Sequence, residues 1–304
     1  MTALQPNHDL SALIAITCDR LNSAASRRVY ASHLRNLIDY VTYKNPGIGF
    51  NRPAVQSWKQ DMLSRGLAPS SVCQAISAAK ALASEAEANG WLDAMTAAAI
   101  RDIDGPPVRG QRMGQWLSQE QAVDLLCQPD QGQAKGQRDW IALALMLGCG
   151  MRREEVVQAG ADRVQRREGR VVLVDVMGKG MRVRTVPVPS WASTAIEMWA
   201  HRLYATYKNA DTPIKLVPRL IGDRPWESLT SAALWYQVRK YAERIGLKVA
   251  PHDLRRTFAQ LSYKGGAPLA QIQMTLGHSS VAVTDRYLGT QLDLIKPACD
   301  FLGV

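Results

Sequence analysis

One segment constrains the organisation of this chain more than any other, the run IDGPPVRGQRMGQ at residues 103–115. It holds two prolines, three glycines and two arginines, and its apolar residues follow neither a helical nor a strand period. Such a composition favours an extended basic linker over a packed element. The 304 residues therefore predict a helical domain over 1–102, an interdomain linker over 103–115 and a second domain over 116–304.

The sequence before the linker predicts helices only. Apolar residues recur at helical spacing within 26–44, within 55–65 and within 72–89. Ser70 or Ser71 precedes the third of these segments, and a serine at that position commonly caps a helix N-terminus. We expect a compact helical bundle.

The second domain combines helical patterns with one sheet signal. Ser118 and Gln121 have the spacing of a capping box, and an apolar helix follows through Leu147. Residues 170–189 are rich in β-branched side chains on both sides of a Gly-Lys-Gly turn, which predicts a β-hairpin. Helical patterns resume at 191–207, at 229–245 and from 252 onward. The predicted fold class is mainly α with a small antiparallel β-sheet, the second domain being α+β.

Composition narrows the class of partner. Lys and Arg number 37 against 27 Asp and Glu, which gives a formal net charge of +10 and favours a polyanion, either nucleic acid or an anionic membrane face. The longest apolar run, 140–151, is shorter than the roughly 18 residues that cross a bilayer. The first ten residues lack the features of a secretion signal, and five scattered cysteines predict neither disulfides nor a metal site. We expect a cytoplasmic protein.

Five short segments of the second domain carry residues that can bind or transfer charge. In chain order they are Gly150–Glu155, Gly178–Gly180, His252–Arg255, Leu276–Ser280 and Thr284–Tyr287. Each has an ordinary structural explanation when taken alone, since most arginines are surface charges and a hairpin lysine, a turn histidine or a packed tyrosine is common. Only their occurrence together points to chemistry.

Two arginines, a lysine, two histidines and a tyrosine are the groups that metal-free transesterification of a phosphodiester requires. Guanidinium groups pair with phosphate oxygens and keep their charge, which stabilises the negative charge of the transition state. A tyrosine hydroxyl can attack phosphorus once a base or a positive field activates it. A lysine can protonate the leaving oxygen, and histidine transfers protons near neutral pH.

The first two segments resemble those of the tyrosine recombinase (phage integrase) family. Gly-Met-Arg-x-x-Glu at 150–155 is similar to the first arginine box of that family. Arg152 fits the register and Arg153 does not, because only Arg152 places Glu155 at the glutamate of the box. Lys179, between two glycines, resembles the lysine of the family's β-hairpin.

The later segments complete the resemblance. HDLRRTFA at 252–259 is similar to the second box, although Arg256 stands where many relatives have histidine. LGHSS at 276–280 is similar to the third box, with Tyr287 nine residues after His278. The match covers most of residues 116–288, and the helical N-terminal part is loosely similar to the core-binding domain of the family.

The resemblance implies a helical core-binding domain, a catalytic domain and no cofactor or metal. It implies six catalytic residues: Arg152 and Arg255 clamp the scissile phosphate, Lys179 protonates the leaving 5′-oxygen, His252 assists proton transfer, His278 hydrogen-bonds a non-bridging oxygen, and Tyr287 is the nucleophile that forms a 3′-phosphotyrosyl link. Glu155 is expected to support the first arginine box. The candidates for further phosphate contacts are Arg182, Arg184, Arg239, Lys240 and Arg256.

The implied partner is a double-stranded DNA recombination site in the nucleoid, bound by a homotetramer on two sites, with accessory proteins as possible additional partners and no membrane. An integrase of a mobile element and a Xer-like resolvase both fit. A DNA-binding protein that does not cut and a type IB topoisomerase are the alternatives. The apolar tail after Tyr287 is expected to pack either on its own domain or on a neighbouring protomer.

Overall fold

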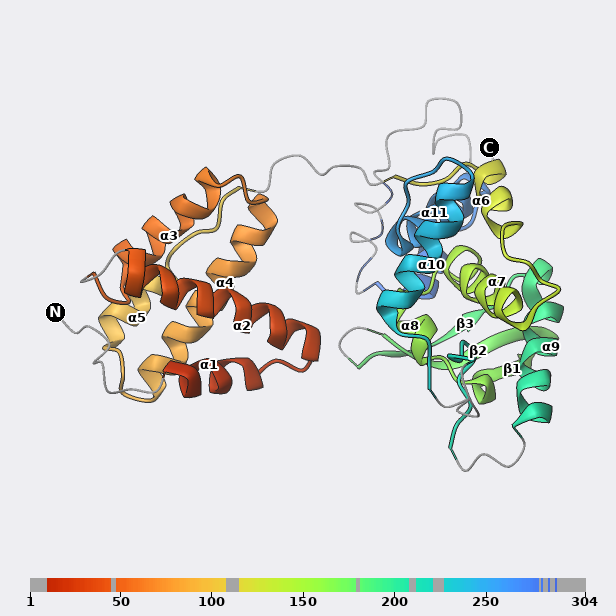
Figure 1. The fold of residues 1–304 in the computed structure, drawn as a ribbon, viewed down its shortest axis with the longest axis horizontal. Coiled ribbons are helices and arrows are strands. Elements are labelled where there is room, and N and C mark those ends of the chain that lie inside the picture. Colours follow the sequence, from red (N-terminus) through yellow and green to blue (C-terminus); the bar gives the residue numbers. More distant parts are fainter. Residues whose placement is uncertain are drawn as a thin grey trace, which may run out of the picture. The chain divides into compact units, whose positions relative to one another are not determined.

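The computed structural model describes residues 10–44, 48–107, 115–178, 181–207, 212–220 and 227–278, together with Ser280, Thr284 and Leu288. The chain divides into two compact units, residues 1–112 and residues 113–304 (Figure 1). Lys179, Tyr287 and residues 289–304 lie outside the described residues. Leu288 is described and is buried.

The first unit is helical throughout the part that is described, as the sequence predicts. Its helices are α1 (Leu10–Asp19), α2 (Ala24–Asp39, extended by a π-helical turn at Tyr40–Lys44), α3 (Arg52–Ser64), α4 (Pro69–Ala88) and α5 (Ala94–Arg101). Trp58 of α3 is fully buried and donates a hydrogen bond from Nε1 to Asn36 Oδ1 at 3.1 Å. Five buried alanines along α4 let the neighbouring helices approach closely, which gives the unit its core.

Two details of this unit differ from the predictions. α4 begins at Pro69 with Ala68 as its N-cap residue and no side-chain cap, so neither Ser70 nor Ser71 caps the helix. The proline lacks an N–H and has a fixed φ, which suits the first helical position and places both serines inside the first turn. Ile103 is buried with the helices, so packed structure extends past the predicted boundary at residue 102.

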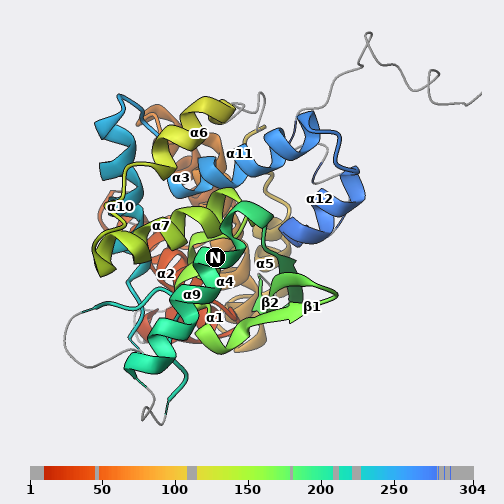
Figure 2. The ribbon, with the colours of Figure 1, turned by 90° about the vertical axis from the view of Figure 1, so that its right-hand side faces the viewer.

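The second unit contains seven described α-helices. They are α6 (Gln119–Leu126), α7 (Ala134–Leu147), α8 (Arg153–Gln158), α9 (Ser190–Thr206), α10 (Ser231–Arg244), α11 (Pro251–Lys264) and α12 (Leu269–Leu276). The predicted capping box at Ser118 and Gln121 is confirmed, and α7 is buried along most of its length. α11 packs on α7 and on α12 (Figure 2). α7 is therefore the central helix around which the other elements are arranged.

The sheet has three antiparallel strands in the order β1-β2-β3, with β1 at Val164–Arg167, β2 at Arg170–Met177 and β3 at Val183–Pro187. The predicted hairpin corresponds to β2 and β3, while β1 was not predicted. β1 is short and mostly exposed, so its sequence carries no alternation. α9 packs on β2 (Figure 1) and α12 on β3, which places the end of α12 beside the hairpin.

A buried polar cluster fixes α7 against α10. Arg138 and Asp139 are both almost fully buried and form an ion pair at 2.6 Å. Tyr241 of α10 donates a hydrogen bond to Asp139 Oδ2 at 2.8 Å, and Arg138 also donates to the carbonyls of Pro218 and Arg219. The cluster is satisfied internally, so it stabilises the unit without needing a ligand. Among the described helices, none has both the length and the apolar character that crossing a membrane requires.

Candidate active site

The carboxylate of Glu155 is the centre of the candidate site. Its side chain is only 3% exposed and lies in the first turn of α8. Oε2 accepts a hydrogen bond from the backbone N–H of Arg152 at 2.8 Å, and Oε1 accepts one from Arg152 Nη1 at 2.8 Å. Arg184 of β3 donates to both oxygens, at 3.1 and 2.7 Å. One carboxylate thus fixes two guanidinium groups from segments 29 residues or more apart.

The charge of Glu155 is stabilised by these donors. Burial by itself raises the pKa of a carboxyl group, because the ionised form loses its hydration. The hydrogen bonds from Arg184 and Arg152 outweigh burial and lower the pKa of Glu155 to about 2. The residue is therefore ionised throughout the physiological range and cannot act as a proton donor there. This geometry agrees with the expected supporting role of Glu155.

Arg255 comes into the site from the first turns of α11. Its side chain is 1% exposed, and its two terminal nitrogens donate to the carbonyls of Gly150 and Leu276. Its Nη1 lies 4.0 Å from Glu155 Oε2. Gly150 has φ +60°, and a Cβ there would lie 2.5 Å from the Phe258 ring, so only glycine allows this carbonyl to face Arg255. Arg255 and Arg152 therefore converge on the same carboxylate.

His278 is positioned by the turn that ends α12. Gly277 adopts the left-handed conformation (φ +63°), and the N–H of His278 donates to the carbonyl of Gln273 at 3.2 Å, which closes the helix end. His278 Nδ1 lies 2.9 Å from Thr284 Oγ1. Burial and the positive charges of Arg255 and Arg152 together lower the pKa of His278 to about 4, with burial the largest cause. The ring is neutral at pH 7 and faces a positive field.

His252 lies at the start of α11, where Pro251 occupies the first helical position and Asp253 accepts a hydrogen bond from the N–H of Ala250 at 2.9 Å. Partial burial of its ring lowers the pKa of His252, and the charges of Arg256 and Arg255 lower it further. A neutral imidazole at pH 7 can take up or release a proton, which suits an acid–base role.

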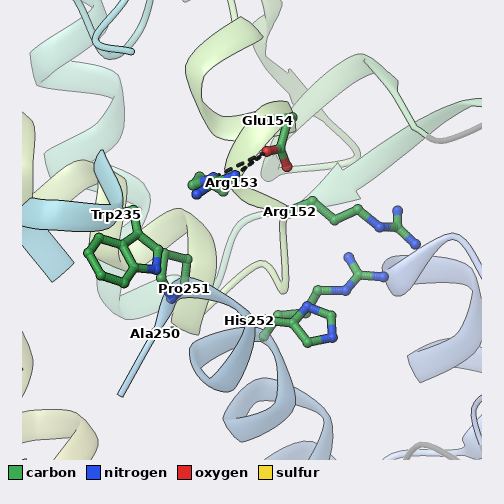
Figure 3. Close-up of a pocket in the computed structure, with 8 residues that line it drawn as sticks. Arg152, Arg153, Glu154, Trp235, Ala250, Pro251 and His252 are labelled. Carbon is green, nitrogen blue, oxygen red and sulfur yellow. Dashed lines mark hydrogen bonds and ion pairs between the residues drawn. The ribbon is translucent and has the colours of Figure 1, made fainter. Parts of the chain in front are cut away.

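A pocket of about 330 Å³ opens beside these groups. It is lined by Arg152, Arg153, Glu154, Trp235, Ala250, Pro251, His252 and Arg255. Figure 3 shows Arg152 and His252 at one end, with Trp235 and Arg153 toward the other. Arg153 and Trp235 were not predicted as site residues. Arg153 follows the box arginine directly, but nothing in the local sequence indicates that α10 brings Trp235 alongside.

The structure brings together four of the six predicted catalytic residues, namely Arg152, His252, Arg255 and His278. Lys179, which follows β2 and precedes β3 in the sequence, and Tyr287, three residues after Thr284, both lie outside the described residues. Their predicted roles stay predictions. Among the described residues, no group of three or more histidine, cysteine, aspartate or glutamate side chains is arranged to hold a metal ion.

The five predicted phosphate-contact residues occupy different environments. Arg184 is only 11% exposed, and its three guanidinium nitrogens bind Glu155 and the carbonyl of Thr275. Its surroundings favour a positioning role over the predicted phosphate contact. Arg239 stacks on Trp235, with its guanidinium carbon 5.0 Å from the ring centroid, and pairs with Glu243. Arg182 and Lys240 are exposed, and Arg256 is half-buried.

Comparison with known proteins assigns the family. The Phage integrase family matches residues 115–292, more than half of the chain. This chain belongs to the phage integrase family. It is 33% identical over 183 residues to the tyrosine recombinase XerD of Pseudomonas putida, and 33% identical over 190 residues to the tyrosine recombinase XerC of Myxococcus xanthus. The alignments cover 60% of this chain and 59% and 61% of those relatives.

Solved structures agree with the fold expected for a phage integrase family member. The chain is similar to the XerH site-specific recombinase bound to a palindromic difH substrate, with a TM-score of 0.70 at 20% identity, covering 94% of this chain and 82% of XerH. It is also similar to a lambda integrase dimer bound to a COC′ core site, with a TM-score of 0.68 at 16% identity, covering 94% and 79% of the two chains. The predicted fold class, mainly α with a small antiparallel sheet, is confirmed.

Proposed function

We propose that this chain is a site-specific DNA recombinase that cuts and rejoins strands through a covalent phosphotyrosine. The observation that carries the proposal is the convergence of Arg152 and Arg255 on one buried carboxylate, with His252 and His278 neutral beside them. Such an arrangement presents fixed positive charge and two neutral imidazoles to a single anion. These are the requirements of phosphodiester transesterification without a metal.

In the proposed reaction, the hydroxyl oxygen of Tyr287 attacks phosphorus and forms an O–P bond while the bond from phosphorus to the 5′-oxygen breaks. His252 accepts the phenol proton, and Lys179 gives a proton to the leaving 5′-oxygen. Arg152, Arg255 and His278 bind the non-bridging oxygens. Because the phosphotyrosine keeps the energy of the phosphodiester, a 5′-hydroxyl of a second strand can reverse the step and join a new partner.

The proposed partners follow from the reaction. Strand exchange needs two DNA sites, and we propose that four copies of the chain assemble on them in the nucleoid, with accessory proteins setting the direction. The formal charge of +10 suits this use, since Lys and Arg contacts to phosphate make binding tight and salt-dependent.

The test uses a duplex selected from a random pool by binding to this chain, then nicked so that cleavage traps the covalent state. We expect a protein–DNA adduct that survives denaturant and forms in the presence of EDTA. Tyr287→Phe should abolish the adduct and leave binding intact. Tyr263→Phe is the matched control, because Tyr263 is a surface tyrosine of the same unit and should keep full activity.

An adduct that survives Tyr287→Phe would remove that tyrosine from the mechanism. Binding with no adduct under any condition would favour a DNA-binding protein that does not cut. Relaxation of supercoiled DNA without any joining of two sites would favour the topoisomerase alternative.

A further inference from the structure

The pocket of about 330 Å³ beside the catalytic groups carries charged side chains at both ends (Figure 3). Arg152, His252 and Arg255 line one end, and these residues serve the proposed reaction. The remainder is lined by Arg153, Glu154, Trp235, Ala250 and Pro251, none of which has a part in that reaction (Figure 3). The lining therefore continues past the site of chemistry.

Arg153 is oriented by its neighbour. Its Nε and Nη2 both donate to Glu154 Oε1, at 3.1 and 2.7 Å, and its side chain is 32% exposed. Among the described residues, nothing accepts a hydrogen bond from its Nη1. Glu154 is 63% exposed, so the pair sits in water and compensates only part of the charge of Arg153. The guanidinium keeps a donor available to an anion that enters the pocket.

Trp235 contacts a guanidinium group from its own helix, α10. The Arg239 guanidinium lies over the indole, 5.0 Å from the centroid, and Arg239 is itself paired with Glu243 at 3.0 Å. Trp235 is 37% exposed, and its Nε1 has no acceptor in the part of the chain that the structure describes. A partly exposed indole with an unused N–H beside an arginine matches a sugar–phosphate unit, which offers an apolar face and an acceptor oxygen.

We propose that Arg153 and Trp235 form a second subsite, which holds the phosphodiester adjacent to the scissile one on the same DNA strand. The first subsite is the one at Arg152 and Arg255, which binds the scissile phosphate in the proposed reaction. This inference therefore rests on the proposed function, because the adjacent phosphate is defined relative to the scissile one. Arg153 Nη1 and Trp235 Nε1 donate to that adjacent phosphate, and the indole packs on the sugar between the two phosphates. The subsite sets the register of the strand, so that the scissile phosphorus lies at Arg152 and Arg255.

The experiment measures binding, so it does not depend on cleavage. A selected duplex is prepared in versions that each carry one uncharged methylphosphonate linkage, and the dissociation constant of each is measured by fluorescence anisotropy with the Tyr287→Phe chain. Arg152→Gln in this background identifies the first-subsite phosphate, as the one whose neutralisation no longer matters. Arg153→Gln should weaken binding of the natural duplex about tenfold. It should also abolish the effect of neutralising the phosphate next to the one assigned to Arg152.

The controls separate this local effect from general loss of charge. Arg166→Gln removes one charge from a surface ion pair with Glu197, and it should leave the effect of every linkage unchanged. Trp235→Phe keeps a ring and removes the N–H, and it should weaken binding about threefold and reduce the effect of the same adjacent linkage.

If every linkage keeps its effect in Arg153→Gln, or if the linkage that loses its effect is not adjacent to that of Arg152, the second subsite is refuted. Absence of a covalent adduct in the wild-type chain would refute the proposed function instead and would leave this binding scan readable.

Discussion

Replacing Glu155 with glutamine tests whether one carboxylate organises the site. The variant keeps the size of the side chain but presents an amide to Arg152 and Arg184, which then lack a counter-charge. Lowering the pKa of Glu155 from 4.5 to about 2 on folding corresponds to about 3 kcal/mol of stability at neutral pH. Breaking a buried ion pair typically costs about 3–5 kcal/mol, which agrees with that figure. We expect Glu155→Gln to lower the free energy of unfolding by about 3 kcal/mol at neutral pH.

The loss of stability in Glu155→Gln should depend on pH. Because the pKa of Glu155 is lower in the folded state, its contribution to stability is complete above about pH 4.5 and disappears as the pH falls toward about 2. The difference in free energy of unfolding between wild type and Glu155→Gln should therefore be constant near neutral pH and shrink across this acidic window.

Urea unfolding of both chains at several pH values, followed by circular dichroism, measures this difference. Glu197→Gln is the matched control, because Glu197 binds Arg166 through both oxygens but at the surface, and it should cost less than about 1 kcal/mol. Equal losses in the two variants, or a difference that does not change with pH, would refute the reasoning. Glu155→Gln should also reduce adduct formation, since Arg152 loses its fixed orientation.

Three further predictions concern the supports of the site. Gly277→Ala should lower the free energy of unfolding in urea by about 1–2 kcal/mol, and so should the control Gly246→Ala, because both glycines have positive φ. Only Gly277→Ala should also slow adduct formation, because its Cβ would lie 3.1 Å from the side chain of Arg184. The His278 ring should titrate with a midpoint of about 4 by NMR, and a midpoint above 6 would contradict the positive field at that position. Tyr241→Phe should lose about 2 kcal/mol in the same unfolding assay, because it removes a hydrogen bond to a buried carboxylate, and an unchanged stability would contradict that role.

The parts of the fold that sequence predicts well are those with local signals. The capping box at Ser118, the buried helix α7 and the β2–β3 hairpin each depend on residues a few positions apart, and each is confirmed. The helix α4 is confirmed as well, but its start is not, because the preference of Pro69 for the first helical position overrides two serines that are good caps in isolation.

Some contacts of the candidate site could not be predicted from nearby residues in the sequence. Arg184 has the appearance of a solvated hairpin arginine, and nothing within β3 shows that it meets a glutamate 29 residues earlier and a carbonyl 91 residues later. Likewise Trp235 enters the pocket through the packing of α10 against α8. These contacts depend on tertiary packing, which the spacing of residues in one segment does not encode.

The guanidinium groups of the site are held in place by partners within the chain. Arg152, Arg184 and Arg255 carry three positive charges and Glu155 one negative charge, while the lowered pKa values leave His252 and His278 neutral at pH 7. This surplus of positive charge has the sign that the transition state needs, because a phosphodiester gains negative charge when a phenolate attacks it. Because carbonyls and a carboxylate already fix the guanidinium groups, little reorganisation accompanies the proposed step. A site that bound only ground-state DNA would need no more than one of these charges per phosphate, so the buried surplus favours catalysis over binding alone.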